Sequence, residues 1–514
     1  MKPPHEEPVL PPFLSLPAEL IQQTFGYLEA LDLARISQTC RLLHQHGKEE
    51  RLWKPLVQAE TPGADFERYP PSSWRETYAT HHPHWFLTRG KLWFSDAVHT
   101  GKLLLARYNP KTEAIEAHSI TAERGPHGFE LWEWNLEVII HRFAPKVQLD
   151  HTGPVLKLDR AAYARAVGDG NRLQQEIMMD VHNNHASHGL YSMFMLARPC
   201  PAQIISPGTR VWPPLTIPAA ERTRNESINR YRGTGHKPSA LPEVSNETFR
   251  LRKWMEFSQQ PAGISMRVGE DVTTFASLDK ALYTPTPAKP WRGVWCGDYA
   301  GHGCEFLLVL QPDAPRALPE GAVRALARRS SSVSSADSWL SAQSHVALAP
   351  DEELVDAAME LAGGDGGGVD GSSTGTVGAD ANTDANAYVS AGANAGTNAG
   401  ADAESQEKEE RDIYAGQIEA IKLTGDPNIP RGEHTFIAPD IGPGGLVRVA
   451  TEEMFRGARV VRSVGHIAAR GFREDEFIPS QLIMISPDRL AQYWAPFGHI
   501  SFYQRVDLGA LLSS

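Results

Sequence analysis

The chain has 514 residues, of which 41% are hydrophobic and 22% are charged. That length has room for about two to four domains, and the composition excludes a wholly disordered or fibrous protein. The formal net charge is −12, but thirteen acidic residues and no Lys or Arg lie between Ser330 and Glu407. The rest of the chain is nearly neutral, so bulk electrostatics give the folded part no attraction to nucleic acid or to an anionic membrane.

The cysteine content indicates a compartment. The chain has four cysteines, none of them in a CxxC pair: Cys40, Cys200, Cys296 and Cys304. Four scattered thiols are not a disulfide framework, so we expect a reducing compartment, the cytoplasm or the nucleus or both. The N-terminal segment lacks the apolar core of a secretory signal, and no run of 18 apolar residues predicts a membrane span.

The first part of the chain predicts short helices. Residues 1–12 are expected to be a disordered leader, whereas residues 13–57 place apolar side chains at helical spacing. Pro17 and Glu19 suit the first turn of a helix. About 45 residues bury their own apolar face poorly, so we expect this helical unit to need a partner. Residues 58–84 are expected to be a linker.

From residue 85 onward, short apolar and aromatic runs separated by Gly, Asn and Pro predict β-strands. Residues 85–312 and 412–514 are predicted to be two parts of one barrel-like domain. Residues 313–411 are predicted to be a disordered acidic insertion, because a segment so rich in small and polar residues cannot offset its ordering entropy by burial. The expected fold class is α+β multidomain: a small N-terminal helical unit, then a mainly antiparallel β-barrel-like domain with a long disordered insertion.

Short motifs in the helical unit follow a known pattern. A Leu-Pro pair with a nearby acidic residue precedes Tyr-Leu, Asp-Leu, Cys-Arg and Leu-Trp pairs, and together they make the segment from Leu16 to Leu56 resemble the F-box. An ordinary helical hairpin of the core is the alternative. The resemblance implies that an apolar helical face docks on the adaptor Skp1 and, through it, on a cullin scaffold. The residues expected to bind Skp1 are Leu16, Pro17, Leu20, Ile21, Leu28, Leu33, Ile36, Cys40, Leu43 and Trp53.

A second resemblance lies in the β region, on Gly293–Leu310, Ile421–Phe436 and Gly465–Val506. With the F-box, these stretches make the chain resemble a fungal F-box protein of the F-box only protein 31 family; the middle of the chain is less similar. The resemblance implies a β-barrel after the F-box and a role as the receptor of a Skp1–cullin–F-box ubiquitin ligase. The vertebrate relative binds substrates, D-type cyclins among them, by their C-terminal ends, so we expect a protein substrate held in that way.

Vertebrate relatives also carry a Cys/His insertion that binds zinc. The corresponding stretch here is Glu113–Phe143, which has no cysteine. His118, His127 and His141 alone do not form a recognisable structural zinc site. Zinc is therefore not carried over from the resemblance, and we expect no cofactor.

Two other histidine clusters have two interpretations each. His182, His185 and His188 could bind a divalent metal or could lie on a solvated helix end. The HHPHW segment at residues 81–85 is expected to be the hinge between the linker and the barrel, with aromatic packing anchors beside it.

Two turns are the candidates for the substrate site. The Gly-rich turn at Gly301–Gly303 and the TGDPNIP segment at Thr424–Pro430 are, from sequence alone, a bulge and a hairpin connection. Such turns can also expose backbone donors at a barrel end, where a narrow pocket reads a peptide terminus. The expected substrate-binding residues are Gly301, His302, Gly303, Asp426, Pro427, Asn428 and His466.

Enzyme signatures such as GxSxG, HExxH and the P-loop motif do not occur in the sequence. We therefore predict a non-catalytic substrate receptor that brings target proteins to ubiquitination and proteasomal degradation. One alternative is an F-box protein that acts with Skp1 outside a ligase. The other is a ligand-binding β-barrel with an accessory helical module. The serine-rich stretch near residue 330 suits either a phosphorylation site or a plain linker.

Overall fold

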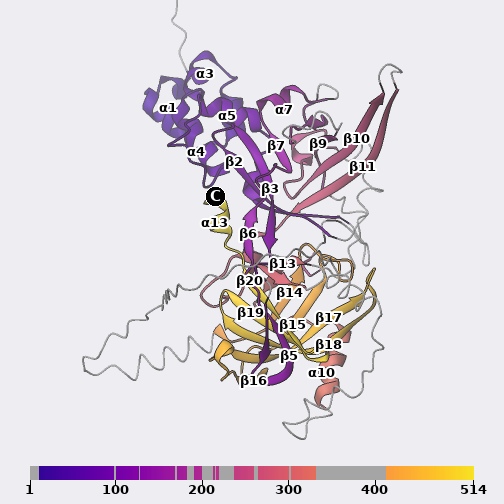
Figure 1. The fold of residues 1–514 in the computed structure, drawn as a ribbon. Helices are drawn as coiled ribbons and strands as arrows, with labels where there is room; N and C mark the ends of the chain where they lie inside the picture. Colours follow the sequence, from indigo (N-terminus) through magenta and orange to yellow (C-terminus); the bar gives the residue numbers. More distant parts are fainter. Residues whose placement is uncertain are drawn as a thin grey trace, which may run out of the picture.

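The computed structural model describes residues 11–97, 100–126, 128–167, 171–181, 190–199, 212, 214, 216–218, 237–259, 264–299, 303–330 and 413–513. Figure 1 shows a cluster of short helices beside one β-sheet, with a second, rounded sheet below them. None of the helices in these ranges is long and apolar enough to cross a membrane.

The helical unit consists of one 3-10 helix and four short α-helices around a small core. The elements are η1 (Pro12–Ser15), α1 (Ala18–Phe25), α2 (Ala30–Ile36), α3 (Arg41–Gly47) and α4 (Glu50–Glu60). The buried core includes Ile21, Leu33 and Trp53. Trp53 donates its indole N–H to the Gly47 carbonyl at 2.8 Å. A Cβ at Gly47 would lie only 1.9 Å from the Ser37 hydroxyl, so glycine is required where α2 and α3 meet.

The predicted linker at residues 58–84 is not an extended connection. It contains α5 (Trp74–His81), and α6 (Phe86–Gly90) follows it closely. Trp85 is 2% exposed and donates its indole N–H to the Tyr78 carbonyl at 3.0 Å. The expected hinge is therefore a packed joint between the helical unit and the first sheet.

Within the described ranges the first sheet has nine antiparallel strands, in the order β6-β3-β2-β1-β11-β10-β9-β8, with β7 also paired to β3. The strands are β1 (Leu92–Ser95), β2 (Leu103–Asn109), β3 (Ala114–Glu123), β6 (Lys146–Leu149), β7 (Leu156–Leu158), β8 (Ile177–Met178), β9 (Leu190–Leu196), β10 (Thr248–Gln259) and β11 (Ile264–Ser277). The minor helices on this part are α7 (Arg160–Ala164), η5 (Leu241–Glu243) and α9 (Lys280–Tyr283).

The second sheet contains a closed antiparallel barrel of eight strands, because β12 pairs with both β13 and β20. The barrel strands are β12 (Gly293–Asp298), β13 (Cys304–Leu310), β14 (Ile418–Lys422), β15 (His434–Ala438), β17 (Arg459–Ala469), β18 (Arg473–Ser486), β19 (Arg489–Trp494) and β20 (His499–Arg505). Closure leaves the ring of strands without an unpaired edge. The remaining elements of this part are β4 (Phe129–Trp132), β5 (Asn135–His141), β16 (Leu446–Val449), α10 (Glu320–Ser330), η9 (Glu453–Phe455), η10 (Ala495–Phe497) and α13 (Leu508–Ser513).

Side chains fill the inside of the barrel. One residue from each strand shows this: Trp295, Leu307, Ala420, Phe436, Val461, Leu482, Leu490 and Tyr503 belong to one buried cluster. Alternate residues of the same strands point outward and share a second cluster with β1, β2 and β5. Both faces of the strands are therefore buried, which explains why their sequences read as continuous apolar runs.

Two predicted boundaries are corrected. Most of residues 85–312 form the first sheet and not the barrel, because strand patterns do not specify which strands pair. Helix α10 lies inside the segment 313–411 that was predicted to be disordered. Its Ala322 and Ala325 pack on the outer barrel wall against Ile437 and Val464. The rest of that segment, from residue 331 to 412, lies outside the described residues.

Candidate protein-binding sites

The structure divides the ten residues expected to bind Skp1 by exposure. Ile21, Leu33, Leu43 and Trp53 are at most 7% exposed and make the core of the helical unit. Leu28, Ile36 and Cys40 are half-buried against that core. Only three of the ten are exposed: Leu16, Pro17 and Leu20.

Two exposed apolar side chains extend this face. Tyr27 follows α1 and is 83% exposed, and Leu31 in α2 is 38% exposed. Leu16 and Leu20 are 39% and 47% exposed. Neither side chain is among the ten residues that the sequence predicts to bind Skp1. We call Leu16, Pro17, Leu20, Tyr27 and Leu31 the helical face. Burial of the neighbouring core residues is the signal that separates this face from the rest of the motif.

The helical unit is fixed to the first sheet by polar as well as apolar contacts. The Thr88 hydroxyl donates to the Glu60 carbonyl at 2.6 Å, which ties α6 to the end of α4. His81 and Tyr163 share a hydrogen bond of 3.1 Å. The His81 ring also packs edge-on against the rings of Tyr108 and Tyr163. A partner bound to the helical face is thus held at a fixed orientation to the sheet.

The predicted substrate turns gather at one end of the barrel. Neighbouring strands alternate in direction, so the connections β12–β13, β14–β15, β17–β18 and β19–β20 share this end, which we call the loop end. Gly471 donates its N–H to the Pro427 carbonyl at 2.8 Å, which joins two of these connections. Gly303 has a φ of 82° and accepts a hydrogen bond from the Tyr299 amide at 3.0 Å.

A buried charge cluster lies just inside the loop end. The Lys422 ammonium contacts the carboxylates of Glu305 and Asp426, and all three side chains are at most 5% exposed. The ammonium also lies 4.1 Å from the centre of the Tyr299 ring, whose hydroxyl shares a 2.7 Å hydrogen bond with Thr435. The cluster therefore satisfies its own charges inside the protein.

The two carboxylates of this cluster differ in protonation. Burial raises the pKa of Glu305 to about 8, because the attraction of Lys422 offsets only part of the desolvation. Burial also acts to raise the pKa of Asp426, but Lys422 and hydrogen bonds to the carboxylate bring it below its usual value. Lys422 therefore lies between one carboxyl whose pKa burial raises and another whose pKa stays below its usual value.

Several residues expected to contact substrate have structural partners instead. Asp426 accepts two backbone hydrogen bonds of 2.6 Å, from the amides of Asn428 and Ile429, and so shapes its own turn. His466 is 5% exposed and stacks on Phe477 with the ring centres 4.3 Å apart. Turn chemistry and barrel packing account for the burial of both residues, and their contact with a substrate stays a prediction.

The outer residues of the turns have other positions. Pro427 and Asn428 are half-buried, and Gly303 closes its own hairpin at the same loop end. Gly301 and His302 lie outside the described residues. The histidines weighed for zinc are spread over the molecule: His118 is in β3 of the first sheet and His141 ends β5. His127 and the cluster of His182, His185 and His188 also lie outside the described residues.

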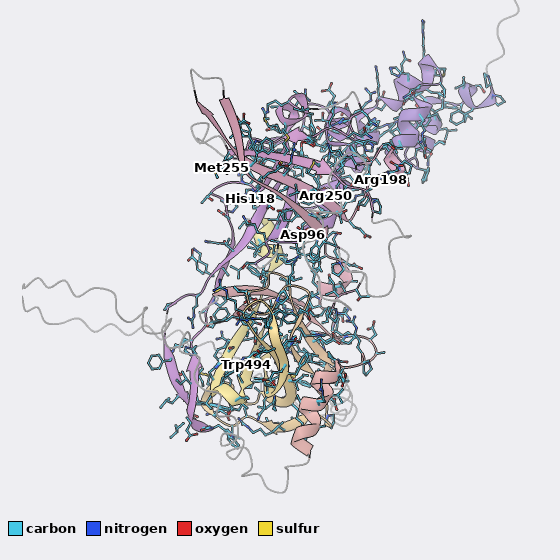
Figure 2. The ribbon with its side chains drawn as sticks, turned by 90° about the vertical axis from the view of Figure 1, so that its right-hand side faces the viewer. Asp96, His118, Arg198, Arg250, Met255 and Trp494 are labelled. Atoms are coloured by element: carbon cyan, nitrogen blue, oxygen red, sulfur yellow. The ribbon has the colours of Figure 1, made fainter. Side chains whose placement is uncertain are left out.

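The loop end faces the first sheet. The Gly101 amide donates to the Thr424 carbonyl at 2.6 Å, and buried Arg431 donates to the Asp96 carbonyl. Figure 2 shows Asp96 between the upper sheet and the barrel that contains Trp494. These two hydrogen bonds join the loop end to the first sheet.

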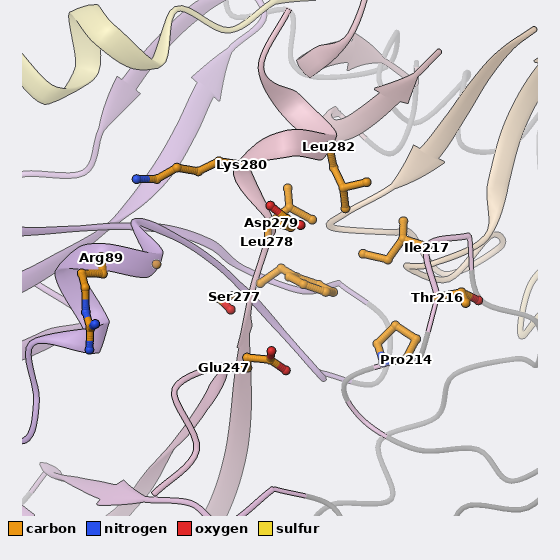
Figure 3. Close-up of a pocket in the computed structure, with 12 residues that line it drawn as sticks. Arg89, Pro214, Thr216, Ile217, Glu247, Ser277, Leu278, Asp279, Lys280 and Leu282 are labelled. Atoms are coloured by element: carbon orange, nitrogen blue, oxygen red, sulfur yellow. The ribbon is translucent and has the colours of Figure 1, made fainter. Parts of the chain in front are cut away.

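A pocket of about 520 Å³ lies beside this junction and not in the barrel. Figure 3 shows Asp279 and Leu282, at and after the start of α9, on the side of Ile217, whereas the Lys280 side chain extends away from Ile217. Residues of the predicted substrate turns do not line this pocket. Its wall mixes apolar side chains with both signs of charge, which defines no single ligand class.

Comparison with known families assigns both regions. Residues 13–59 match the F-box-like family, which covers the helical unit. Residues 275–510 match the Cyclin D1 binding domain family, which covers α9, the whole barrel and the long segment between β13 and β14. A search of curated proteins found no match. The chain therefore combines an N-terminal helical unit similar to the F-box-like family with a C-terminal barrel similar to the Cyclin D1 binding domain.

Proposed function

We propose that the protein is the substrate-recognition subunit of a Skp1–cullin–F-box ubiquitin ligase, and that it does no chemistry itself. The F-box would bind Skp1, the barrel would hold the target protein, and the complex would direct that target to proteasomal degradation. Proximity is the contribution, because a tethered lysine has a high effective concentration near the charged enzyme. Its cysteine usage fits work in the cytoplasm or the nucleus.

The observation that carries the proposal is the helical face. Leu16, Leu20, Tyr27 and Leu31 expose apolar surface on a unit whose core is otherwise well packed. Exposed apolar patches of this kind usually mark binding sites, and an apolar helical face suits docking into a groove. The packed joint to the first sheet would keep Skp1 and the barrel in a constant relation.

Skp1 recovery tests this proposal. Leu20→Asp together with Leu31→Asp should abolish co-purification of Skp1, because each charge would be desolvated against an apolar partner. Both positions are exposed, so far-UV circular dichroism should stay unchanged. Leu190→Asp, at a residue 42% exposed in the first sheet, is the matched control and should retain Skp1. Unchanged recovery by the double variant would refute the assignment. Co-purification of Skp1 without a cullin would favour action outside a ligase.

For the target, we propose that the loop end reads the C-terminal end of a protein such as a D-type cyclin. Support comes from the match to the Cyclin D1 binding domain and from the half-buried Pro427, Asn428 and Gly303 in connections at the loop end. The filled barrel interior offers no described space for a ligand-binding lumen, which weakens the alternative of a ligand-binding barrel.

Peptide capture tests the target site. Two peptides that differ only in a free or an amidated C-terminus should bind with different affinities. Asn428→Ala should weaken binding of the peptide with the higher affinity and leave Skp1 binding intact. Asn428 suits the test better than Asp426, because Asp426 shapes its own turn. Equal binding of both peptides to wild type and variant would place the target elsewhere.

A further inference from the structure

The β4–β5 hairpin exposes a large apolar surface on the side of the barrel. Phe129 and Leu131 in β4 are 75% and 57% exposed, and Leu131 pairs across the strands with Ile139, which is 40% exposed. At the hairpin tip, Trp134 and Leu136 are 59% and 69% exposed. We call these five residues the hairpin patch. Figure 1 shows β5 on the lower flank of the barrel, away from the F-box helices α1 and α3.

The hairpin patch continues onto the barrel itself. The Ile139 amide donates to the Gly498 carbonyl at 2.9 Å, which places Phe497 beside the hairpin. Phe497 is 48% exposed. Contiguous apolar surface of this kind is uncommon on a soluble protein unless it binds something.

β4 is also a sheet edge. It is the last strand in the order β20-β5-β4, so β5 is its only strand partner in the described part of the chain. The Gly128 carbonyl accepts the Arg142 amide at 2.8 Å, and hydrogen-bonded positions alternate along an antiparallel pair. The N–H and C=O groups of Phe129 and Leu131 therefore point away from β5. Edges with such groups beside apolar side chains are templates for strand addition.

The charge around the hairpin patch selects the partner. Glu133 and Glu137 are exposed at the hairpin tip, and Glu453 donates its backbone N–H to the Glu133 carboxylate at 3.2 Å. Glu453 brings a third exposed carboxylate, whereas the nearby Arg142 is already paired with Glu130. Carboxylates at the rim of an apolar strip favour a peptide that carries basic residues.

We propose that the β4 edge is a second docking site, which adds an extended segment of a partner protein as a further strand. In that segment, apolar residues alternate with Lys or Arg. The apolar side chains would lie beside Phe129 and Leu131, and the basic ones would face the exposed carboxylates of Glu133, Glu137 and Glu453. The site is independent of the F-box and of the loop end, so it goes beyond the proposed function.

The probe is a short fluorescent peptide of alternating Val and Lys, titrated into the full chain. One control peptide alternates Val and Glu, and another has the Lys and Val residues in two blocks. The alternating basic peptide should bind saturably, and the other two at least tenfold more weakly. A version with N-methyl groups on alternate amides should also lose at least tenfold, because it cannot complete the strand hydrogen bonds.

Leu131→Pro tests the edge without breaking the hairpin. Proline removes the Leu131 N–H, which points away from β5, and is tolerated on the open side of an edge strand. We expect at least tenfold weaker binding with an unchanged far-UV spectrum. Phe129→Ser is the second variant and should weaken binding through lost apolar contact. Leu190→Ser, an exposed apolar residue of the first sheet, is the control and should bind like wild type.

Three results would overturn the proposal. Equal binding of the Lys and Glu peptides would remove the charge argument, and wild-type affinity in Leu131→Pro and with the N-methylated peptide would remove the edge. Concentration-dependent self-association that Leu131→Pro abolishes, without saturable peptide binding, would instead identify a second copy of the chain as the occupant.

Discussion

The F-box and the loop end of the barrel both carry recognisable motifs, but their motif residues differ in exposure and in bonding partners. In the F-box, Leu16 and Leu20 are exposed while Ile21 and Leu33 make the core. At the loop end, the most conspicuous polar residues, Asp426 and His466, find their partners within the protein. The comparison teaches that a motif locates a unit reliably, whereas burial decides which of its residues remain available to a partner.

The largest expected effect is a loss of stability when the buried charge cluster inside the loop end is broken. Lys422→Met leaves the buried Glu305 and Asp426 without their cation, and removal of one partner of a buried pair costs about 3–5 kcal/mol. Urea unfolding should show this loss in the free energy of unfolding. Lys111→Met, at an exposed lysine, is the control and should change stability by less than about 0.5 kcal/mol. A loss below about 1 kcal/mol for Lys422→Met would show that the cluster is not structural.

The next effect separates the two kinds of F-box residue. Ile21→Ala removes a side chain that is 1% exposed and should cost about 2–5 kcal/mol. Leu20→Ala, at the adjacent residue that is 47% exposed, should leave stability nearly unchanged but reduce Skp1 recovery. Thermal unfolding and Skp1 pull-down on the same samples test the contrast. If Leu20→Ala destabilised the unit as much as Ile21→Ala did, the division into core and helical face would be wrong.

A smaller effect concerns pH at the joint between the F-box and the first sheet. Burial lowers the pKa of His81 to about 3 and holds the pKa of His84 well below its ordinary value of 6.5. The unfolded chain therefore binds more protons than the folded one below pH 6.5, so stability falls as the pH drops from there toward 3. The slope is about 1.4 kcal/mol per pH unit for each such histidine.

His84→Phe sharpens this prediction. Both ring nitrogens of His84 lack a hydrogen-bond partner among the described residues, and the ring stacks on Tyr163. Phenylalanine should keep the stacking on Tyr163. It should also remove one histidine's contribution to the dependence of the free energy of unfolding on pH, as measured by urea unfolding between pH 7 and pH 5. An unchanged slope would mean that His84 is not neutral and buried in solution.

The smallest expected effect is the change in melting temperature when the segment between α10 and β14 is shortened. A short Gly/Ser linker in place of residues 331–412 should change the melting temperature little, because most apolar residues of that segment are alanines that bring little area to bury and loop closure depends weakly on length. A longer deletion from residue 313 should be more harmful, since it removes the α10 packing of Ala322 and Ala325. Equal melting temperatures for the two deletions would show that α10 adds nothing to the barrel.

Sequence patterns predicted the F-box and the presence of a mainly antiparallel barrel. They did not predict which strands share a sheet, because residues 92–95 and 293–298 have the same apolar character and strand pairing is decided by contacts far apart in the sequence. Helix α10 was missed although Ala322, Ala325 and Leu326 have helical spacing, because the composition of the following segment dominated that prediction.

The candidate sites were predictable to a similar degree. Leu16 and Leu20 are motif positions that are exposed in the structure, whereas Ile21 is next to Leu20 in α1 and only packing shows that it is buried. The aromatic run at residues 129–141 was recognised as strand, yet its exposure on an edge depends on the late strand β20, more than 350 residues away.

The closure of the barrel by β12 and β20 also has a consequence for synthesis on the ribosome. About 200 residues separate the end of β12 from the start of β20, and translation at about 5–20 residues per second takes about 10–40 s to cover them. During that time β12 and β5 both lack their pairing partner β20. The F-box and the first sheet are complete much earlier, so a nascent chain could recruit an adaptor, or a chaperone for its open barrel, before translation ends.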